Sequence, residues 1–230
     1  MTVAMADHPK PVSVVTALYL RTKALHLEAE RSGIIRDLLR GEASLEGYLL
    51  LLRNLLPGYR TMERGLERHR DAPGLAELAE FRLDRAPAIE SDLSQLCGQT
   101  WEREIPLLHA GNIYAQRIAK AAEGDGVRLI AHAYTRYLGD LSGGQILQRL
   151  LARSLNLQPA QLTFYDFPRF SDLAVLKTDY RNALDTAGAL ATDPQAVVEE
   201  GAIAFSLIID LSCAVQALLS SGSIPATAAE

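Results

Sequence analysis

The sequence predicts an all-α protein that folds as one domain. Apolar residues recur at helical spacing through most of the chain, no long run alternates apolar and polar residues, and no linker-like stretch divides it. We expect about eight helices between residues 12 and 219, with flexible segments at 1–11 and 220–230. The 230 residues are 48% hydrophobic and 22% charged, which is typical of a globular protein with a sizeable core.

In the first half of the chain, helices are expected over 12–31, 44–70 and 87–96. The first has a single apolar stripe at three-to-four spacing, made of Val15, Leu18, Tyr19, Thr22, His26 and Ala29. We expect Pro57-Gly58 to kink or break the second, because proline lacks an amide hydrogen. Pro87 suits the first turn of the third helix, and Gly98 would stop it.

In the second half, the longest helical pattern covers 127–155, with a shorter one before it at 113–122. An aromatic loop at 162–170 precedes a helix at 171–187, which Gly188 would end. Asp193-Pro194 then provides a cap and a first turn for the last helix. Residues 201–219 approach the length of a membrane span, but Asp210 at their centre favours a buried helix of a soluble domain.

The overall charge and the cysteine count exclude several classes of protein. The formal net charge of −5 argues against a duplex-binding protein, so we expect no nucleic-acid partner. Cys97 and Cys213 cannot form a disulfide framework. With no signal-peptide pattern at the N-terminus, we expect a cytoplasmic protein without a membrane span.

Glycines within the longest helical pattern are the first unusual feature. Gly139 and Gly143 share one helical face, although each costs about 1 kcal/mol relative to alanine. They leave either a shelf where a ligand can touch the backbone or a site of close helix packing. The Leu141–Gln145 string LSGGQ resembles the ABC-type ATPase signature, but the chain contains no phosphate-binding loop.

His26 is the second unusual feature. Glu30 follows it by four residues, a spacing that lets a carboxylate support the ring of a metal-ligating histidine. A structural histidine is the alternative. His132 is the rival ligand, but it lies on the same helix as the glycine shelf.

Together these segments resemble the heme oxygenase family. The block 131–145 (AHAYTRYLGDLSGGQ) matches the family signature, 22–30 resembles the proximal-histidine helix, and 177–181 resembles the propionate-binding helix. The resemblance implies an all-α fold that holds heme between the first helix and a glycine-kinked distal helix. It also implies oxidative cleavage of heme by dioxygen and reducing equivalents to biliverdin, carbon monoxide and ferrous iron.

The resemblance implies a role for each site residue. His26 would be the proximal iron ligand, oriented by Glu30, while Gly139 and Gly143 would bring the distal backbone close to the heme face. Asp140, Arg136 and Tyr59 would hold a distal water network that delivers protons. Heme propionates and the pocket wall would be served by Lys23, Tyr134, Lys177, Arg181 and Phe205.

Two positions depart from the family pattern. Tyr19 stands where well-known members carry a lysine toward a propionate, which puts heme seating in doubt. Ile208 stands where some relatives place an asparagine in the distal network, which puts the water arrangement in doubt.

Other functions and partners stay open at this point. The same fold could carry heme without turnover, as a carrier or sensor, or perform another chemistry, as in thiamin-degrading helical enzymes that use a catalytic cysteine. The chain carries no C-terminal anchor that we recognise. We therefore expect a soluble electron donor, either a ferredoxin or a flavin/NADPH reductase, docking at the basic propionate edge.

Overall fold

The computed structural model describes residues 13–222, and every regular element within that range is helical. The predicted flexible segment 1–11 and most of the predicted segment 220–230 lie outside the described residues. The all-α prediction is confirmed. Counting the distal helix once gives ten α-helices among the described residues, whereas about eight were expected. The short helices α2 (Gly33–Arg40), α4 (Leu75–Glu80) and α6 (Trp101–Glu104) were not predicted, because they had no clear sequence pattern.

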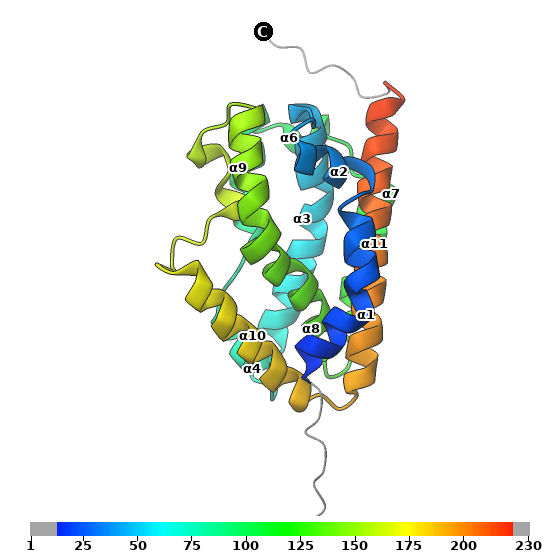
Figure 1. Cartoon of the computed structure of the whole chain (residues 1–230), viewed down its shortest axis with the longest axis vertical. Coiled ribbons are helices and arrows are strands. Elements are labelled where there is room, and N and C mark those ends of the chain that lie inside the picture. Colours follow the sequence, from blue (N-terminus) through cyan, green and yellow to red (C-terminus); the bar gives the residue numbers. More distant parts are fainter. Residues whose placement is uncertain (1–12, 223–230) are drawn as a thin grey trace, which may run out of the picture.

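The long helices form a bundle around α3 (Leu45–Arg68) (Figure 1). α3 packs against α5 (Ala86–Cys97) and α7 (His109–Ala121). The N-terminal α1 (Val14–Ala29) lies alongside the C-terminal α11 (Pro194–Ser220), so the two ends of the fold are held together. α10 (Leu173–Ala189) packs against both α1 and α4.

Side-chain caps define where several helices begin. Ser13, Ser44, Asp172 and Asp193 each accept a hydrogen bond from a backbone amide in the first turn of the following helix. These bonds satisfy amides that have no partner within the helix. The predicted Asp193-Pro194 start is therefore confirmed, and α5 begins with proline in its first turn as expected.

Of the kink or break predicted at Pro57-Gly58, the structure excludes the break. The helix continues through Pro57, with Leu56 and Tyr59 buried on either side of the dipeptide. This burial offsets the roughly 3 kcal/mol that an internal proline costs. Gly58 serves packing instead, because a Cβ there would lie 2.7 Å from the Tyr114 ring on α7.

Gly188 also fails to stop its helix. α10 continues to Ala189, and a Cβ on Gly188 would lie 2.3 Å from the Val14 side chain. The residue therefore allows α10 and α1 to approach closely.

The predicted helix at 127–155 is continuous from 129 to 154 and is named the distal helix below. It consists of α8 (Leu129–Ala133), two π-helical segments (Tyr134–Leu138 and Asp140–Gly144) and α9 (Gln145–Ser154). Gly139 joins the π-helical segments with φ −62° and ψ −49°, which are ordinary right-handed helical values. The glycines therefore leave the backbone helical, and π-turns of this kind often occur at functional sites.

By length and composition, α11 is the one helix in the described part of the chain that could cross a membrane. A single helix of this kind is weak evidence, because core helices of globular proteins meet the same criteria. α11 packs against α1, α2, α7 and α8, and Asp210 within it is exposed. A membrane span is therefore not indicated.

Candidate heme site

Three predicted residues meet in one buried hydrogen-bond network. The Tyr59 hydroxyl on α3 donates to Asp140 Oδ2 at 2.6 Å, and Arg136 Nε donates to the Tyr59 oxygen at 2.8 Å. Arg136 Nη2 also lies 3.3 Å from Asp140 Oδ1 one helical turn away, which closes the triangle. Tyr59 and Asp140 are buried, and 15% of the Arg136 side chain is exposed, so most of the network is shielded from bulk solvent. We name these three residues the distal triad.

In the distal triad, burial and the neighbouring polar groups shift the pKa values of Asp140 and Arg136 in opposite directions. Burial raises the pKa of Asp140, while the Arg136 charge and the Tyr59 hydrogen bond lower it. Burial would lower the pKa of Arg136, but Tyr59 and Asp140 outweigh burial and raise it. Burial also raises the pKa of Tyr59 well above its ordinary value, so the phenol keeps its proton. The triad thus combines a fixed cation, a fixed hydrogen-bond donor and a carboxyl group of raised pKa.

Beside the triad, the distal helix has an open strip of backbone. A Cβ built on Gly139 or Gly143 would have no atom within 4 Å among the described residues, apart from its chain neighbours and the adjacent helical backbone, and both residues are exposed. Gly144 differs, because a Cβ there would lie 3.1 Å from the Tyr165 ring. Of the two roles left open for Gly139 and Gly143, the structure rules out close helix packing. A flat ligand can lie against this strip without meeting a side chain.

His26 lies on α1, and 57% of its side chain is exposed. Its Nδ1 is 3.5 Å from Glu30 Oε1, and its Nε2 has no hydrogen-bond partner among the described residues. Phe205 on α11 lies beside the ring, with 5.7 Å between ring centroids. Spacing predicted that His26 and Tyr19 lie on the apolar stripe of α1, but both are exposed, whereas the other members of the stripe are buried. An exposed imidazole with one oriented nitrogen and one unused nitrogen suits an axial ligand.

These features fit a heme group. The described residues contain no cluster of three side chains that could ligate a metal ion. An iron ion held here would therefore need further ligands from outside the protein, such as the nitrogens of a porphyrin ring. His26 can provide one axial nitrogen, and the open strip at Gly139 and Gly143 provides a flat contact.

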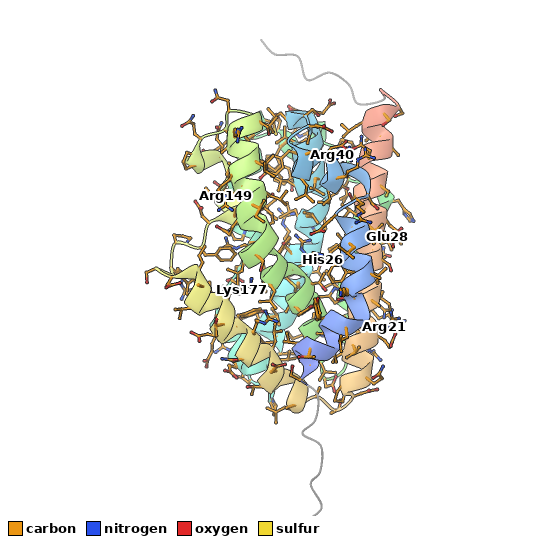
Figure 2. All side chains as sticks on the ribbon, in the orientation of Figure 1. Arg21, His26, Glu28, Arg40, Arg149 and Lys177 are labelled. Atoms are coloured by element: carbon orange, nitrogen blue, oxygen red, sulfur yellow. The ribbon has the colours of Figure 1, made fainter. Side chains whose placement is uncertain are left out.

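The predicted propionate-binding residues come from three helices. Tyr134 is partly buried in the distal helix and faces Thr22 of α1 and Arg181 of α10, which both lower its pKa against the larger effect of burial. Lys23, Lys177 and Arg181 have no carboxylate partner within residues 13–222. In Figure 2, His26 lies on the α1 side of the distal helix and Lys177 on the α10 side. The cations therefore remain available for an anionic ligand.

The two departures from the family pattern have different surroundings. Tyr19 is 50% exposed on α1, whereas Ile208 is buried in α11. The Ile208 side chain has no polar atom with which to join the network. The hydroxyl of Tyr114 on α7 is also buried, and it has no hydrogen-bond partner among the described residues. The distal triad therefore closes on itself without a contribution from α11.

His132 does not compete with His26 for a ligand. Its ring is fully buried, and Nε2 lies 3.0 Å from the buried Glu200 Oε1. Arg117 Nε donates to the same carboxylate at 2.8 Å. These bonds join the distal helix, α7 and α11, so the role of His132 is structural.

The sequence analysis missed the residues that support the distal triad from behind. Phe164 of the aromatic loop packs edge-on against Tyr59, and Arg85 and Asp92 bind the same loop. The cluster of aromatic residues at 164–170 was the only sequence signal, because the contacts depend on helices that are distant along the chain.

Comparison with known proteins agrees with this geometry. The sequence profile of the heme oxygenase family matches residues 12–213. Heme oxygenase 1 from Nostoc sp. is 36% identical over 196 residues, covering 85% of this chain and 82% of its own. The crystal structure of heme oxygenase-1 from Synechocystis sp. in complex with heme has a TM-score of 0.83 at 31% identity, covering 92% of this chain and 96% of its own.

A more distant likeness shows the shared fold alone. A TenA homologue from P. horikoshii has a TM-score of 0.64 at 13% identity, which shows a shared fold and no more. Neither cysteine of this chain contacts the distal triad, since Cys97 Sγ donates to Leu93 O and Cys213 is exposed. The chain belongs to the heme oxygenase family, whose members are oxidoreductases that cleave heme to biliverdin.

Proposed function

We propose that heme binds between α1 and the distal helix, with His26 as the proximal ligand and the distal triad on the opposite face. The position of the triad beside the open strip at Gly139 and Gly143 carries this proposal. Bound heme supplies the redox chemistry and the ring that is cleaved, with dioxygen and external electrons as co-reactants.

In this proposal, each residue has a defined task. Glu30 would orient the imidazole of His26 through Nδ1 and leave Nε2 to hold the iron. The glycines admit the ring and crowd its distal face. Asp140 anchors water through its carboxylate and passes protons to the reacting centre, while Arg136 and Tyr59 hold that carboxylate in place.

The cationic edge would fix the orientation of heme. Lys23, Lys177 and Arg181 would pair with the propionates, and the Tyr134 hydroxyl would donate to them. Phe205 would contact the ring from the α11 side, next to His26. Tyr19 offers a hydroxyl without charge at this edge, so it orients heme less strongly than a cation would.

The experiment that tests this function is one optical titration. Ferric heme is added to the purified protein, followed by a chemical reductant in air. Loss of the sharp heme band with growth of a broad red biliverdin band is the expected result. A stable heme band would instead favour a carrier or sensor, and it would direct attention to Tyr19 and Ile208.

We further propose that the enzyme is cytoplasmic and takes electrons from a soluble ferredoxin or a flavin/NADPH reductase. The unpaired cations of the propionate edge support docking of an acidic partner there. If this is right, reduction of the heme-bound protein by such a donor should slow as ionic strength rises.

A further inference from the structure

Arg85 is a buried cation just before α5, with no carboxylate partner among the described residues. Only 8% of it is exposed. Its guanidinium donates to the carbonyl oxygens of Leu83, Phe164 and Asp166, and it stacks over the Phe167 ring at 4.2 Å. Burying a guanidinium that no carboxylate contacts directly is costly, so its position calls for a reason beyond packing.

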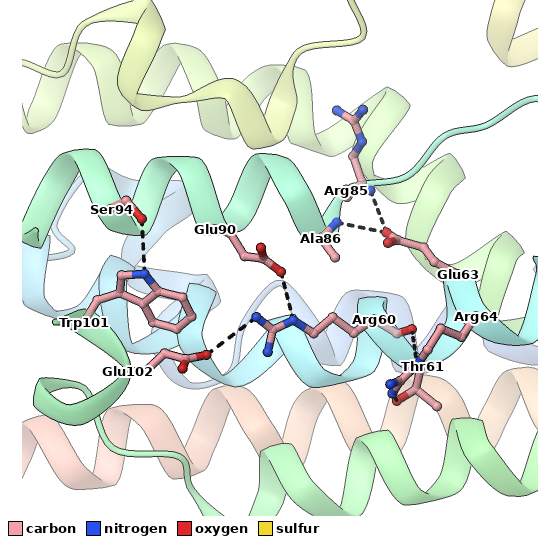
Figure 3. Close-up of polar contacts among 10 residues, drawn as sticks. All are labelled: Arg60, Thr61, Glu63, Arg64, Arg85, Ala86, Glu90, Ser94, Trp101 and Glu102. Carbon is pink, nitrogen blue, oxygen red and sulfur yellow. Dashed lines mark hydrogen bonds and ion pairs between the residues drawn. The ribbon is translucent and has the colours of Figure 1, made fainter. Parts of the chain in front are cut away.

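The backbone of Arg85 is fixed to α3. Glu63 Oε1 accepts hydrogen bonds from the Arg85 amide at 2.6 Å and from the Ala86 amide at 2.9 Å (Figure 3). Glu63 lies one helical turn after Tyr59 on the same helix, so both face the same side of α3. The Arg85 side chain points away from α3 in this view.

The carbonyls that Arg85 binds belong to the aromatic loop, which lies against the distal triad. Phe164 meets the Tyr59 ring edge-on, with 5.5 Å between centroids. Asp92 binds the same loop through the amides of Thr163 and Phe164. Gln145 of the distal helix also donates to Tyr165 O at 2.8 Å, so the loop has anchors other than Arg85.

From these contacts we propose that Arg85 is a positioning residue for heme cleavage. By fixing the Phe164 carbonyl, it holds the aromatic ring that sets the place of the Tyr59 phenol, and through Tyr59 it aligns the Asp140 carboxylate. Its charge also stabilises the ionised form of that carboxylate. This inference rests on the proposed role of Asp140.

The electrostatics around Asp140 are consistent with this assignment. Arg136 on the distal helix, Tyr59 on α3 and Arg85 each lower the pKa of Asp140, against the larger raising effect of burial. Tyr114 on α7 and Tyr165 of the loop are the other titratable groups that face this carboxylate. Arg85 is thus the only cation outside the distal triad that acts on Asp140 among the described residues.

The test compares Arg85→Met with Arg53→Met. Methionine keeps the apolar stem but removes the charge and the donors, and Arg53 is a matched control because it stacks on Trp101 at 5.2 Å. The first measurement is a carboxyl ¹³C NMR titration of Asp140 in the heme-free protein, assigned with Asp140→Asn. The second is the ring chemical shifts of Tyr59 in the same samples.

We expect Asp140 to titrate at higher pH in Arg85→Met than in the wild-type protein, with altered Tyr59 ring shifts. Neither should change in Arg53→Met. Biliverdin formation should fall by about tenfold in Arg85→Met, as the loss of a charged hydrogen bond predicts. Arg85→Lys keeps the charge but has fewer hydrogen-bond donors, so its Asp140 titration and its rate of biliverdin formation should lie between those of the wild-type protein and Arg85→Met.

An unchanged Asp140 titration and unchanged Tyr59 shifts in Arg85→Met would overturn the proposal. If Arg85→Met does not fold, the same comparison is made with Arg85→Lys, and wild-type behaviour in that variant would overturn it equally. Full biliverdin yield in Asp140→Asn would refute the role of Asp140 itself. The heme-free titration would still report whether Arg85 positions that carboxylate, so the two failures are distinguishable.

Discussion

The Tyr59 hydroxyl donates a 2.6 Å hydrogen bond to Asp140 across 81 positions of sequence, from the central helix to the distal helix. The same oxygen accepts from Arg136, so one phenol links a cation to a carboxylate. Its raised pKa keeps the phenol a donor at any physiological pH.

Replacing Tyr59 with phenylalanine should remove this link while retaining the ring that packs on Phe164. A hydrogen bond to a charged group contributes about 1.5–3 kcal/mol, so biliverdin formation should slow by tenfold or more. Single-turnover kinetics would measure this change. Tyr180→Phe is a suitable control, because Tyr180 is a buried tyrosine whose hydroxyl has no hydrogen-bond partner among the described residues. Equal rates for the two variants would contradict the role given to Tyr59.

Replacing Gly143 with alanine should separate stability from function. The added methyl meets no protein atom, and alanine favours a helix interior by up to about 1 kcal/mol, so the heme-free protein should melt at the same or a higher temperature. Heme affinity should nevertheless fall, because the methyl occupies the open strip. Thermal melting and heme titration would test both outcomes.

Gly144→Ala is the matched control for this prediction. Its methyl would lie 3.1 Å from the buried Tyr165 ring, so its melting temperature should fall below that of Gly143→Ala. If Gly143→Ala left heme affinity unchanged, the strip would not be a heme contact.

His26→Ala should abolish axial ligation with little loss of stability, because the side chain is exposed. His132→Ala should do the opposite, since it leaves the buried Glu200 with only Arg117 as a partner. Electron paramagnetic resonance of the heme-bound variants would report the ligand, and chemical denaturation would report stability. If the imidazole signature were lost in His132→Ala and kept in His26→Ala, His132 and not His26 would be the iron ligand.

The Glu200 carboxylate should make stability depend on pH at acidic values. Burial acts to raise its pKa, but hydrogen bonds from His132 and Arg117 outweigh burial and lower the pKa from 4.5 to about 2. A lowered folded-state pKa stabilises the fold above pH 4.5, and this contribution disappears as pH falls toward 2. Its size is on the order of 3 kcal/mol.

Chemical denaturation of the wild-type protein and Glu200→Gln between pH 2 and pH 6 would measure this contribution. The difference in free energy of unfolding between the two should shrink as pH falls through that window. A constant difference would show that Glu200 does not titrate in this way.

Helix type and much of the site could be predicted from sequence because both depend on local spacing. The apolar period gave the long helices, and the signature block placed Arg136, Gly139, Asp140 and Gly143 on one helix. The packing roles of Gly58 and Gly188 were missed because contacts with Tyr114 and Val14, which are remote in sequence, decide what those glycines do.

The support behind the distal triad could not be predicted for a related reason. Arg85 binds backbone carbonyls, which every residue possesses, so no residue type marks its partners. Asp92 likewise holds backbone amides of the aromatic loop. Such contacts follow from the path of the chain and leave no pattern along it.

The bare strip at Gly139 and Gly143 has a consequence for motion in the heme-free protein. With no side chains to cover them, the amide groups of this stretch depend on the helix alone for protection, so they should exchange with solvent faster than those of α3. Bound heme would cover this stretch and slow that exchange. Release of the cleaved product would expose this stretch again.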